Sequence, residues 1–351
     1  MSKFVSKRLA SIEAYTPGEQ PQDKKYIKLN TNESPYPPSE GVIEAINKGA
    51  VERLRLYCDP ECKKLRQALA NLYEVSANNV FVSNGSDDIL NFCFMAYGDG
   101  GVAYADITYG FYPVFAELYG ITPTIVPLNE DFSLNVEAFK GQNKLVVIAN
   151  PNAPTGMEIT LKDIEEIVVS NPNSVVVIDE AYVDFGGTSA ILLTKKYNNL
   201  IVCATYSKSR SMAGARLGFA IANEDLINDL NTIKYSTNPY NVNTLTQIAG
   251  EKAIEDNEYY LENARKIIAT RDYTVKELNK LGFKVLPSVA NFIFATSQKI
   301  SGLDLYLKLK EEGVLIRHFE KPRIANYNRI TIGSKEEMEI FISKVTKILG
   351  E

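Results

Sequence analysis

Apolar and polar positions along the chain alternate between two periods, which predicts strands and helices in turn. Three continuous runs of β-branched and other apolar residues are typical of strands buried on both faces of a parallel sheet. The three long runs predict strands at residues 144–149, 174–179 and 200–205, and two shorter runs predict strands at residues 80–83 and 101–105. The predicted helices are residues 40–49, 60–74, 109–119 and a segment that starts near residue 87. This alternation indicates an α/β fold whose central sheet is mostly parallel and flanked by helices.

The pattern changes after about residue 235. A long helical stretch at 241–280 is followed by short strands and helices, which indicates a smaller α+β domain. Its predicted strands and helices are residues 283–286, 291–295, 303–312, 314–316, 329–332 and 335–349. At the other end, the prolines of residues 26–38 exclude regular structure. We therefore expect an N-terminal arm at 1–38, a large domain at 39–236 and a small C-terminal domain at 237–351.

Composition narrows the possible chemistry. The chain has 351 residues, a net charge of −5 and a single histidine, His318, which excludes metal motifs that need two histidines. Four cysteines have no zinc-type spacing, and we expect them to be reduced thiols of a cytoplasmic protein. No basic run favours nucleic acid, and no apolar run is long enough for a leader or a transmembrane helix. We expect no bound metal and no catalytic role for His318.

Polar clusters follow the predicted strands, where α/β sheets bind their ligands. In residues 83–88, Gly85 permits a tight turn, after which Ser86 and Asp87 would start a helix with free backbone N–H groups. This geometry suits a phosphate, although the same residues favour an ordinary helix start. The second cluster, residues 150–156, holds two prolines and a glycine. It is either a rigid loop that presents the Asn152 amide or an ordinary turn.

Two further clusters carry charge. Asp179 ends an apolar strand. Burying a carboxylate there costs free energy unless the charge is paired, for example with a cationic nitrogen of a ligand. The alternative is that Asp179 caps a helix. Tyr182, three residues later, could face the same space. Lys208 follows the strand at 200–205 and is a candidate for Schiff-base formation, or else a surface lysine. Arg216 offers a planar fork for phosphate.

These residues together resemble the fold type I pyridoxal-phosphate aminotransferases. The shared positions are Asp179, Tyr182, Ser207, Lys208, Ala213, Gly214, Arg216 and Gly218. The spacing of 29 residues from Asp179 to Lys208 and the Asn-Pro-x-x-Pro-Thr-Gly loop also match that family. Within it, the chain is most similar to the histidinol-phosphate aminotransferases. The segments that carry this similarity, over nearly the whole chain, are residues 29–36, 56–60, 314–317 and 328–333.

The resemblance implies a role for each candidate residue. Lys208 would bind pyridoxal 5′-phosphate and move the substrate proton, Asp179 would pair with the ring nitrogen, and Tyr182 would hydrogen-bond the ring hydroxyl. Tyr109 would stack on the ring, unless it is only a core aromatic. The phosphate contacts would come from Ser86, Asp87 (through its backbone), Ser207 and Arg216, with Tyr57 from the other subunit of a homodimer. Tyr57 could instead be a core residue.

For substrates, the resemblance implies histidinol phosphate and 2-oxoglutarate on one side, and imidazole-acetol phosphate and glutamate on the other. The arginines Arg329 and Arg317 would bind their anionic groups, and Tyr15 and Asn32 would close the site from the arm; each of the four could also be structural. The chain departs from the family at Ser34 and Cys58, and Ala153 occupies the position of an Asn that contacts the cofactor. That contact must come from Asn152 or be missing.

Three other functions share some of these features. An L-threonine-O-phosphate decarboxylase has the same lysine and phosphate-binding residues, but Asn32-Glu33-Ser34-Pro35 favours the aminotransferase over the N-I-N-P sequence typical of the decarboxylase. An aminotransferase for aromatic amino acids is the second. The third is a non-enzymatic binding relative, which the intact Lys208, Asp179 and Arg216 disfavour.

Overall fold

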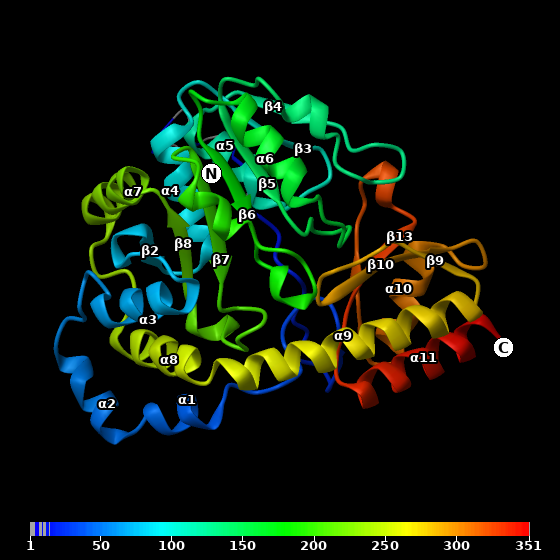
Figure 1. Cartoon of the computed structure of the whole chain (residues 1–351). Coiled ribbons are helices and arrows are strands. Elements are labelled where there is room, and N and C mark those ends of the chain that lie inside the picture. The colour runs from blue at the N-terminus through cyan, green and yellow to red at the C-terminus, as the bar shows by residue number, and fades with distance from the viewer. Residues whose placement is uncertain (1–3, 7–8, 10–11, 14, 351) are drawn as a thin grey trace.

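The large sheet has seven strands and carries the predicted α/β topology (Figure 1). The computed structural model describes residues 4–6, 9, 12–13 and 15–350. In spatial order, the strands are β2 (Val80–Ser83), β8 (Gly218–Ala222), β7 (Leu200–Thr205), β6 (Val176–Asp179), β5 (Leu145–Ala149), β3 (Val102–Ala105) and β4 (Pro123–Val126). β8 is antiparallel to both neighbours, and all other pairs are parallel. The five predicted strands are confirmed, and the structure adds β4 and β8.

Helices cover both faces of this sheet because alternate strand residues point to opposite sides. Val146 and Ile148 contribute to one buried cluster, and Leu145 and Val147 contribute to the other. The first cluster includes residues of α3 (Lys63–Tyr73), α6 (Leu161–Ser170) and α8 (Thr244–Glu255). The second includes residues of α4 (Ser86–Tyr97), α5 (Phe111–Tyr119) and α7 (Glu224–Thr237). Burial on both faces explains why the central strands are almost uniformly apolar.

The C-terminal part forms a four-stranded antiparallel sheet packed on helices. Its strands, in spatial order, are β12 (Arg317–His318), β13 (Tyr327–Thr331), β10 (Phe292–Ser297) and β9 (Phe283–Val285). Its helices are α9 (Asn257–Lys280), α10 (Gly302–Glu311) and α11 (Lys335–Leu349). α9 runs from the large sheet's side of the molecule to the small sheet and so connects the two parts (Figure 1).

Two predicted helices are broken in the structure. The stretch 241–280 is two helices, α8 and α9, that meet at Asp256. The stretch 40–49 divides into α1 (Glu40–Ala45) and α2 (Lys48–Glu52), because Asn47 leaves the helical conformation and caps the second helix through Ala50 N. α8 packs against α1 and α3 although it follows the expected domain boundary at residue 236, which stays a prediction.

The segment 26–38 is irregular as predicted, apart from one short strand. β1 (Ile27–Lys28) pairs in parallel with β11 (Val314–Leu315) of the small domain. Immediately after it, Leu29 O accepts a hydrogen bond from Thr331 N at 2.9 Å. This pairing fixes residues 30–33 between the small sheet and the carboxyl ends of the large one.

A glycine at the start of β8 allows the first turn of α4 to approach the sheet. A Cβ on Gly218 would lie 2.5 Å from both Gly85 C and Ser86 N, which are backbone atoms that cannot move aside. We expect Gly218→Ala to lower the free energy of unfolding by about 1–3 kcal/mol, the usual cost of overpacking. Gly214→Ala is the matched control, because a Cβ there meets nothing within 4 Å. Equal losses in a denaturant titration of the two variants would contradict this account.

Candidate functional site

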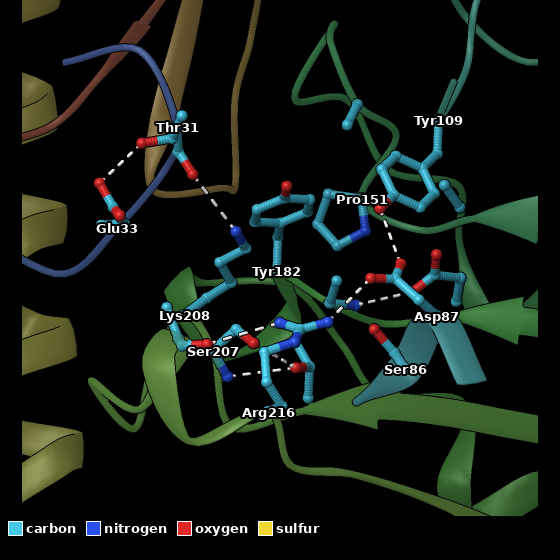
Figure 2. Close-up of a pocket in the computed structure, with 16 residues that line it drawn as sticks. Thr31, Glu33, Ser86, Asp87, Tyr109, Pro151, Tyr182, Ser207, Lys208 and Arg216 are labelled. Atoms are coloured by element: carbon cyan, nitrogen blue, oxygen red, sulfur yellow. Dashed lines mark hydrogen bonds and ion pairs between the residues drawn. The ribbon is translucent and has the colours of Figure 1, made fainter. Parts of the chain in front are cut away.

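Two adjoining cavities open where the central strands end. The first, of about 220 Å³, is bordered by the last residues of β5, β6 and β7, namely Ala149, Asp179 and Thr205. It brings together most of the predicted cofactor residues, which are Ser86, Asp87, Tyr109, Asp179, Tyr182, Ser207, Lys208 and Arg216 (Figure 2). The second, of about 270 Å³, holds the predicted substrate residues Tyr15, Asn32, Arg317 and Arg329. Lys208, Tyr109 and Tyr182 line both cavities.

Lys208 is therefore placed where two ligands would meet. It follows β7 by three residues, and its amine points across the first cavity towards the arm segment (Figure 2). Its Nζ donates a hydrogen bond of 3.3 Å to the Thr31 carbonyl oxygen and lies 5.8 Å from the centre of the Tyr182 ring. Within the described residues its hydrogen-bond partner is a single backbone carbonyl, a contact that it can exchange for a ligand.

Asp179 is a buried carboxylate without a cationic partner among the described residues. It is 4% exposed, and its oxygens accept hydrogen bonds from Tyr112 Oη at 2.9 Å and from Ala181 N at 3.2 Å. Burial raises its pKa from 3.8 to about 6, and the bond from Tyr112 opposes that rise. A ligand with a positively charged ring nitrogen would supply the missing charge.

The opposite end of the first cavity is built for an anion. α4 begins at Ser86 after Gly85, which offers no side-chain cap, so its first N–H groups are free to bind a ligand. Arg216 reaches this end, where its Nη2 forms a 2.9 Å ion pair with Asp87. Asp87 also accepts a 2.7 Å hydrogen bond from Tyr109 Oη, and burial together with this carboxylate raises the pKa of Tyr109.

The second cavity is strongly cationic. Lys208, Arg317, Lys321 and Arg329 line it, and no carboxylate is among its lining residues. Arg329 Nη2 donates to Asn30 O at 2.8 Å, while its buried Nε has no hydrogen-bond partner in the described part of the chain. Burial lowers the pKa of Arg329. A buried guanidinium with a spare donor suits a substrate that carries more than one negative charge.

Two predicted residues do not reach these cavities. The Asn152 amide donates to Ile107 O at 3.0 Å and to Thr155 Oγ1 at 3.1 Å, and Asn152 lines neither cavity. The amide therefore ties the loop to itself and to the Ile107 carbonyl, and is not presented to either cavity. Tyr57 is 84% exposed and stacks on Tyr240 with ring centres 4.5 Å apart, beside a separate surface cavity.

Sequence reasoning missed several residues of the site. Tyr112 binds Asp179, and Thr31 binds Lys208. The position of Tyr112, one helical turn after Tyr109, was a usable signal once Tyr109 was placed at the cavity. Lys321 had no signal, because its loop reaches the cavity only through the packing of the small domain.

The first cavity fits pyridoxal phosphate by the chemistry of its donors. It combines an uncapped helix start and Arg216 for the phosphate, a buried carboxylate for the ring nitrogen, and an amine at Lys208 for the aldehyde. Tyr182, like Lys208, lines both cavities. Within the described residues, no cluster of His, Cys, Asp or Glu is arranged to hold a metal ion, and no helix could cross a membrane.

The raised pKa of Asp179 makes the cofactor-free protein pH-sensitive. The folded state binds the proton of the Asp179 carboxyl more tightly than the unfolded state does. The contribution of Asp179 to the free energy of unfolding therefore falls as pH rises from about 4 to above 6. The change in pKa from 3.8 to about 6 corresponds in full to about 3 kcal/mol. Because the unfolded-state carboxyl is already partly ionised at pH 4, we expect the difference in unfolding free energy, Asp179→Asn minus wild type, to grow by about 2 kcal/mol from pH 4 to pH 7.

Urea unfolding of the cofactor-free proteins at several pH values measures this difference. The same substitution at the exposed Asp99, which lies outside any helix, is the control for replacing a carboxyl that is not buried. A difference for Asp179→Asn that stays constant with pH would show that its carboxyl is not held in a protonating environment.

Comparisons with known proteins agree with this geometry. Residues 24–345 match the family described as aminotransferase class I and II. The histidinol-phosphate aminotransferase of Brachyspira hyodysenteriae is 51% identical over 352 residues, covering 99% of each chain. The fold is shared with a Sinorhizobium meliloti histidinol-phosphate aminotransferase crystallised with pyridoxal-5′-phosphate, at a TM-score of 0.89 and 22% identity over 100% of this chain and 98% of that one.

The fold alone does not distinguish between activities. An L-threonine-O-3-phosphate decarboxylase from Porphyromonas gingivalis superposes with a TM-score of 0.80 at 23% identity, over 93% of this chain and 100% of that one. The family assignment depends instead on the full-length sequence match and on the family model. The chain belongs to the class I and II aminotransferases and, within them, to the histidinol-phosphate aminotransferase family.

Proposed function

We propose that this protein is a cytoplasmic, pyridoxal-phosphate-dependent aminotransferase of histidine biosynthesis. It would interconvert histidinol phosphate and 2-oxoglutarate with imidazole-acetol phosphate and glutamate. The observation that carries the proposal is the adjoining pair of cavities. One joins Lys208 to the buried Asp179, and the other offers four cations and no carboxylate to an anionic substrate.

Pyridoxal phosphate, when bound, withdraws electrons from the substrate Cα and holds the amino group between the two half-reactions. Ser86 and Arg216 would hold its phosphate, and Asp179 would pair with its ring nitrogen and keep that nitrogen protonated. The buried position of Asp179 strengthens this pairing, because little water screens it. Tyr109, whose ring lines both cavities, would cover one face of the ring.

Lys208 would remove the proton from the substrate Cα and deliver it to the carbon that the cofactor's aldehyde group supplies, on the other side of the amino nitrogen. Its Nζ lies where the two cavities join, and the Thr31 carbonyl gives the free amine a position within hydrogen-bonding distance. This contact would keep the amine close to the substrate after it has been displaced from the cofactor. A base that is already positioned contributes more to the rate than the same group in solution.

Arg329 and Arg317 would bind the anionic end of each substrate. Histidinol phosphate has no α-carboxylate, so its phosphate would occupy the place that a carboxylate of glutamate takes. Both groups match the planar guanidinium fork. The Arg317 Nη atoms make only long contacts, 3.4 and 3.5 Å, to carbonyl oxygens of residues 16–17, which an anionic substrate can replace. Tyr15 lies beside Arg329 in the same cavity and would close the site from the arm.

A turnover assay with four amino substrates tests this function. The purified enzyme with pyridoxal phosphate and 2-oxoglutarate is offered histidinol phosphate, histidinol, phenylalanine or threonine phosphate. We expect the highest kcat/KM for histidinol phosphate. Equal use of histidinol and histidinol phosphate would mean that the phosphate is not recognised. Release of carbon dioxide from threonine phosphate would assign the decarboxylase activity instead, and a preference for phenylalanine would assign an aromatic aminotransferase.

If one arginine, Arg329, binds both substrates, its substitution should impair both half-reactions to a similar extent. We expect Arg329→Lys to lower kcat/KM about ten- to a hundred-fold for both histidinol phosphate and glutamate, since a lysine ammonium lacks the bidentate fork. Turnover of dephosphorylated histidinol, slow in the native enzyme, should change much less. A loss confined to one half-reaction would show that the two substrates use different cations.

We also propose that two copies of the chain form a homodimer with shared active sites. Exposed apolar side chains are frequent between the end of α1 and Tyr57. They are Ile46, Val51, Leu54 and Leu56. An apolar surface next to an exposed tyrosine is typical of a subunit interface. In the dimer, Tyr57 would contact the cofactor phosphate of the partner.

Subunit mixing tests whether Tyr57 acts in the partner's site. Both parent proteins, Tyr57→Phe and Lys208→Ala, should be impaired, the second completely. Unfolding and refolding the two together produces mixed dimers in which one site has both native residues. With random pairing we expect recovery of about a quarter of the wild-type activity. No recovery above that of the Tyr57→Phe parent would place Tyr57 in its own subunit's site or give it a purely structural role.

A further inference from the structure

A buried chain of hydrogen bonds joins strand β13 to the cavity. Thr331, the last residue of β13, is 1% exposed, and its hydroxyl donates a 2.9 Å hydrogen bond to Asn32 Oδ1. Asn32, also 1% exposed, donates from Nδ2 to Tyr182 Oη at 3.1 Å. Asn32 and Tyr182 line the second cavity, and Tyr182 also lines the first. Thr331 lines neither cavity and is linked to Tyr182 through Asn32.

The direction of each hydrogen bond in this series follows from the Thr331 hydroxyl. Asn32 N donates to Thr331 Oγ1 at 2.9 Å, and a backbone N–H can only donate, so the hydroxyl accepts there and keeps its own proton for another partner. That proton is donated to Asn32 Oδ1. With its oxygen bound to Thr331, the Asn32 amide presents its nitrogen to Tyr182. The Asn32 backbone is itself held by Asn291 Nδ2, which donates to Asn32 O at 2.9 Å.

The consequence concerns the proton of Tyr182. Because its hydroxyl already accepts a hydrogen bond from Asn32, its own proton is not used in that contact and can be donated into the cavity. If the amide were reversed, Asn32 Oδ1 would face Tyr182 and attract this proton away from the cavity. The orientation of one buried amide thus decides whether Tyr182 acts as a donor to a ligand.

We propose that Thr331 is a positioning residue that, through Asn32, directs the Tyr182 hydroxyl proton to the ring oxygen of bound pyridoxal phosphate. This inference rests on the proposed contact between Tyr182 and that oxygen. Thr331 lies two residues after Arg329 on the same strand, so both side chains leave the same face of β13. One strand would therefore bind the substrate anion and set the electronic state of the cofactor.

The pH dependence of the cofactor's visible absorption reports this contact. A hydroxyl that donates to the ring oxygen stabilises the negative charge on that oxygen. It therefore lowers the pKa of the bound cofactor, which is measured as the pH midpoint of the change in its visible absorption. We expect Thr331→Val, which keeps the shape but lacks the hydroxyl, to raise that pKa by about one unit, the effect of weakening a hydrogen bond to a charged group. Thr331→Ser restores the hydroxyl and should return the pKa to within a few tenths of the wild-type value.

Two further variants separate the possible failures. Thr296→Val, in the neighbouring strand β10, removes a threonine hydroxyl that binds Asn326 O and should leave the absorption pKa unchanged. Tyr182→Phe removes the proposed donor and should raise the pKa at least as much as Thr331→Val. No shift in Tyr182→Phe would refute the proposed role of Tyr182. A shift in Tyr182→Phe with none in Thr331→Val would leave that role standing and overturn the present inference.

The dissociation constant for pyridoxal phosphate gives a second readout that does not depend on turnover. Loss of the Tyr182 donor should weaken binding several-fold in Thr331→Val and not in Thr331→Ser. Should Thr331→Val fail to fold, because it leaves the Asn32 N–H buried without an acceptor, Thr331→Ala with space for a water replaces it. An unchanged pKa and dissociation constant in a folded variant that lacks the hydroxyl would overturn the proposal.

Discussion

Asp179 places a charge inside the large sheet, and the arrangement of the site follows from the need to pair that charge. The three residues before it in β6 are fully buried, so water cannot solvate the carboxylate from the sheet side. A hydrogen bond from Tyr112 satisfies one oxygen without neutralising the charge. A cationic ring nitrogen in the adjacent cavity would complete the pairing that the described residues do not supply. The same burial that disfavours the empty site therefore favours the bound cofactor.

The arm segment connects the two halves of the chemistry. Residues 29–33 leave β1, which pairs with the small domain, and pass over the carboxyl ends of the large sheet. On this path the Thr31 carbonyl holds the Lys208 amine, the Asn30 carbonyl holds Arg329, and the Asn32 amide holds Tyr182. A movement of the small domain would shift all three contacts together. In the proposed mechanism, substrate binding at Arg329 and proton transfer at Lys208 would in this way be linked by three consecutive residues, Asn30, Thr31 and Asn32.

Much of the site was predictable because its residues follow strands whose order along the chain was already clear. Parallel strands present their carboxyl ends at one edge, so Asp179 and Lys208 had to converge there. Asn152 was expected at the same edge, but its amide binds Thr155 in its own loop and the Ile107 carbonyl, which a local sequence pattern does not reveal. Tyr57 lies outside the two adjoining cavities of its own chain, and a single sequence does not show which subunit a residue serves. Tyr112 and Thr331 were missed because each contacts a side chain of the site, Asp179 or Asn32, that lies far from it in sequence.

The sequence by itself determined the central strands, the composition of the four polar clusters and the family resemblance, because these depend on periodicity and short spacings. Only the tertiary structure decided which polar atoms meet. The antiparallel insertion of β8 between β2 and β7 joins strands far apart in sequence, and it brings Arg216 beside Asp87. The packing of β13 against the arm likewise places Thr331 on Asn32 across 299 positions of the chain. Such contacts depend on the free energy of the whole packed chain, which no local pattern encodes.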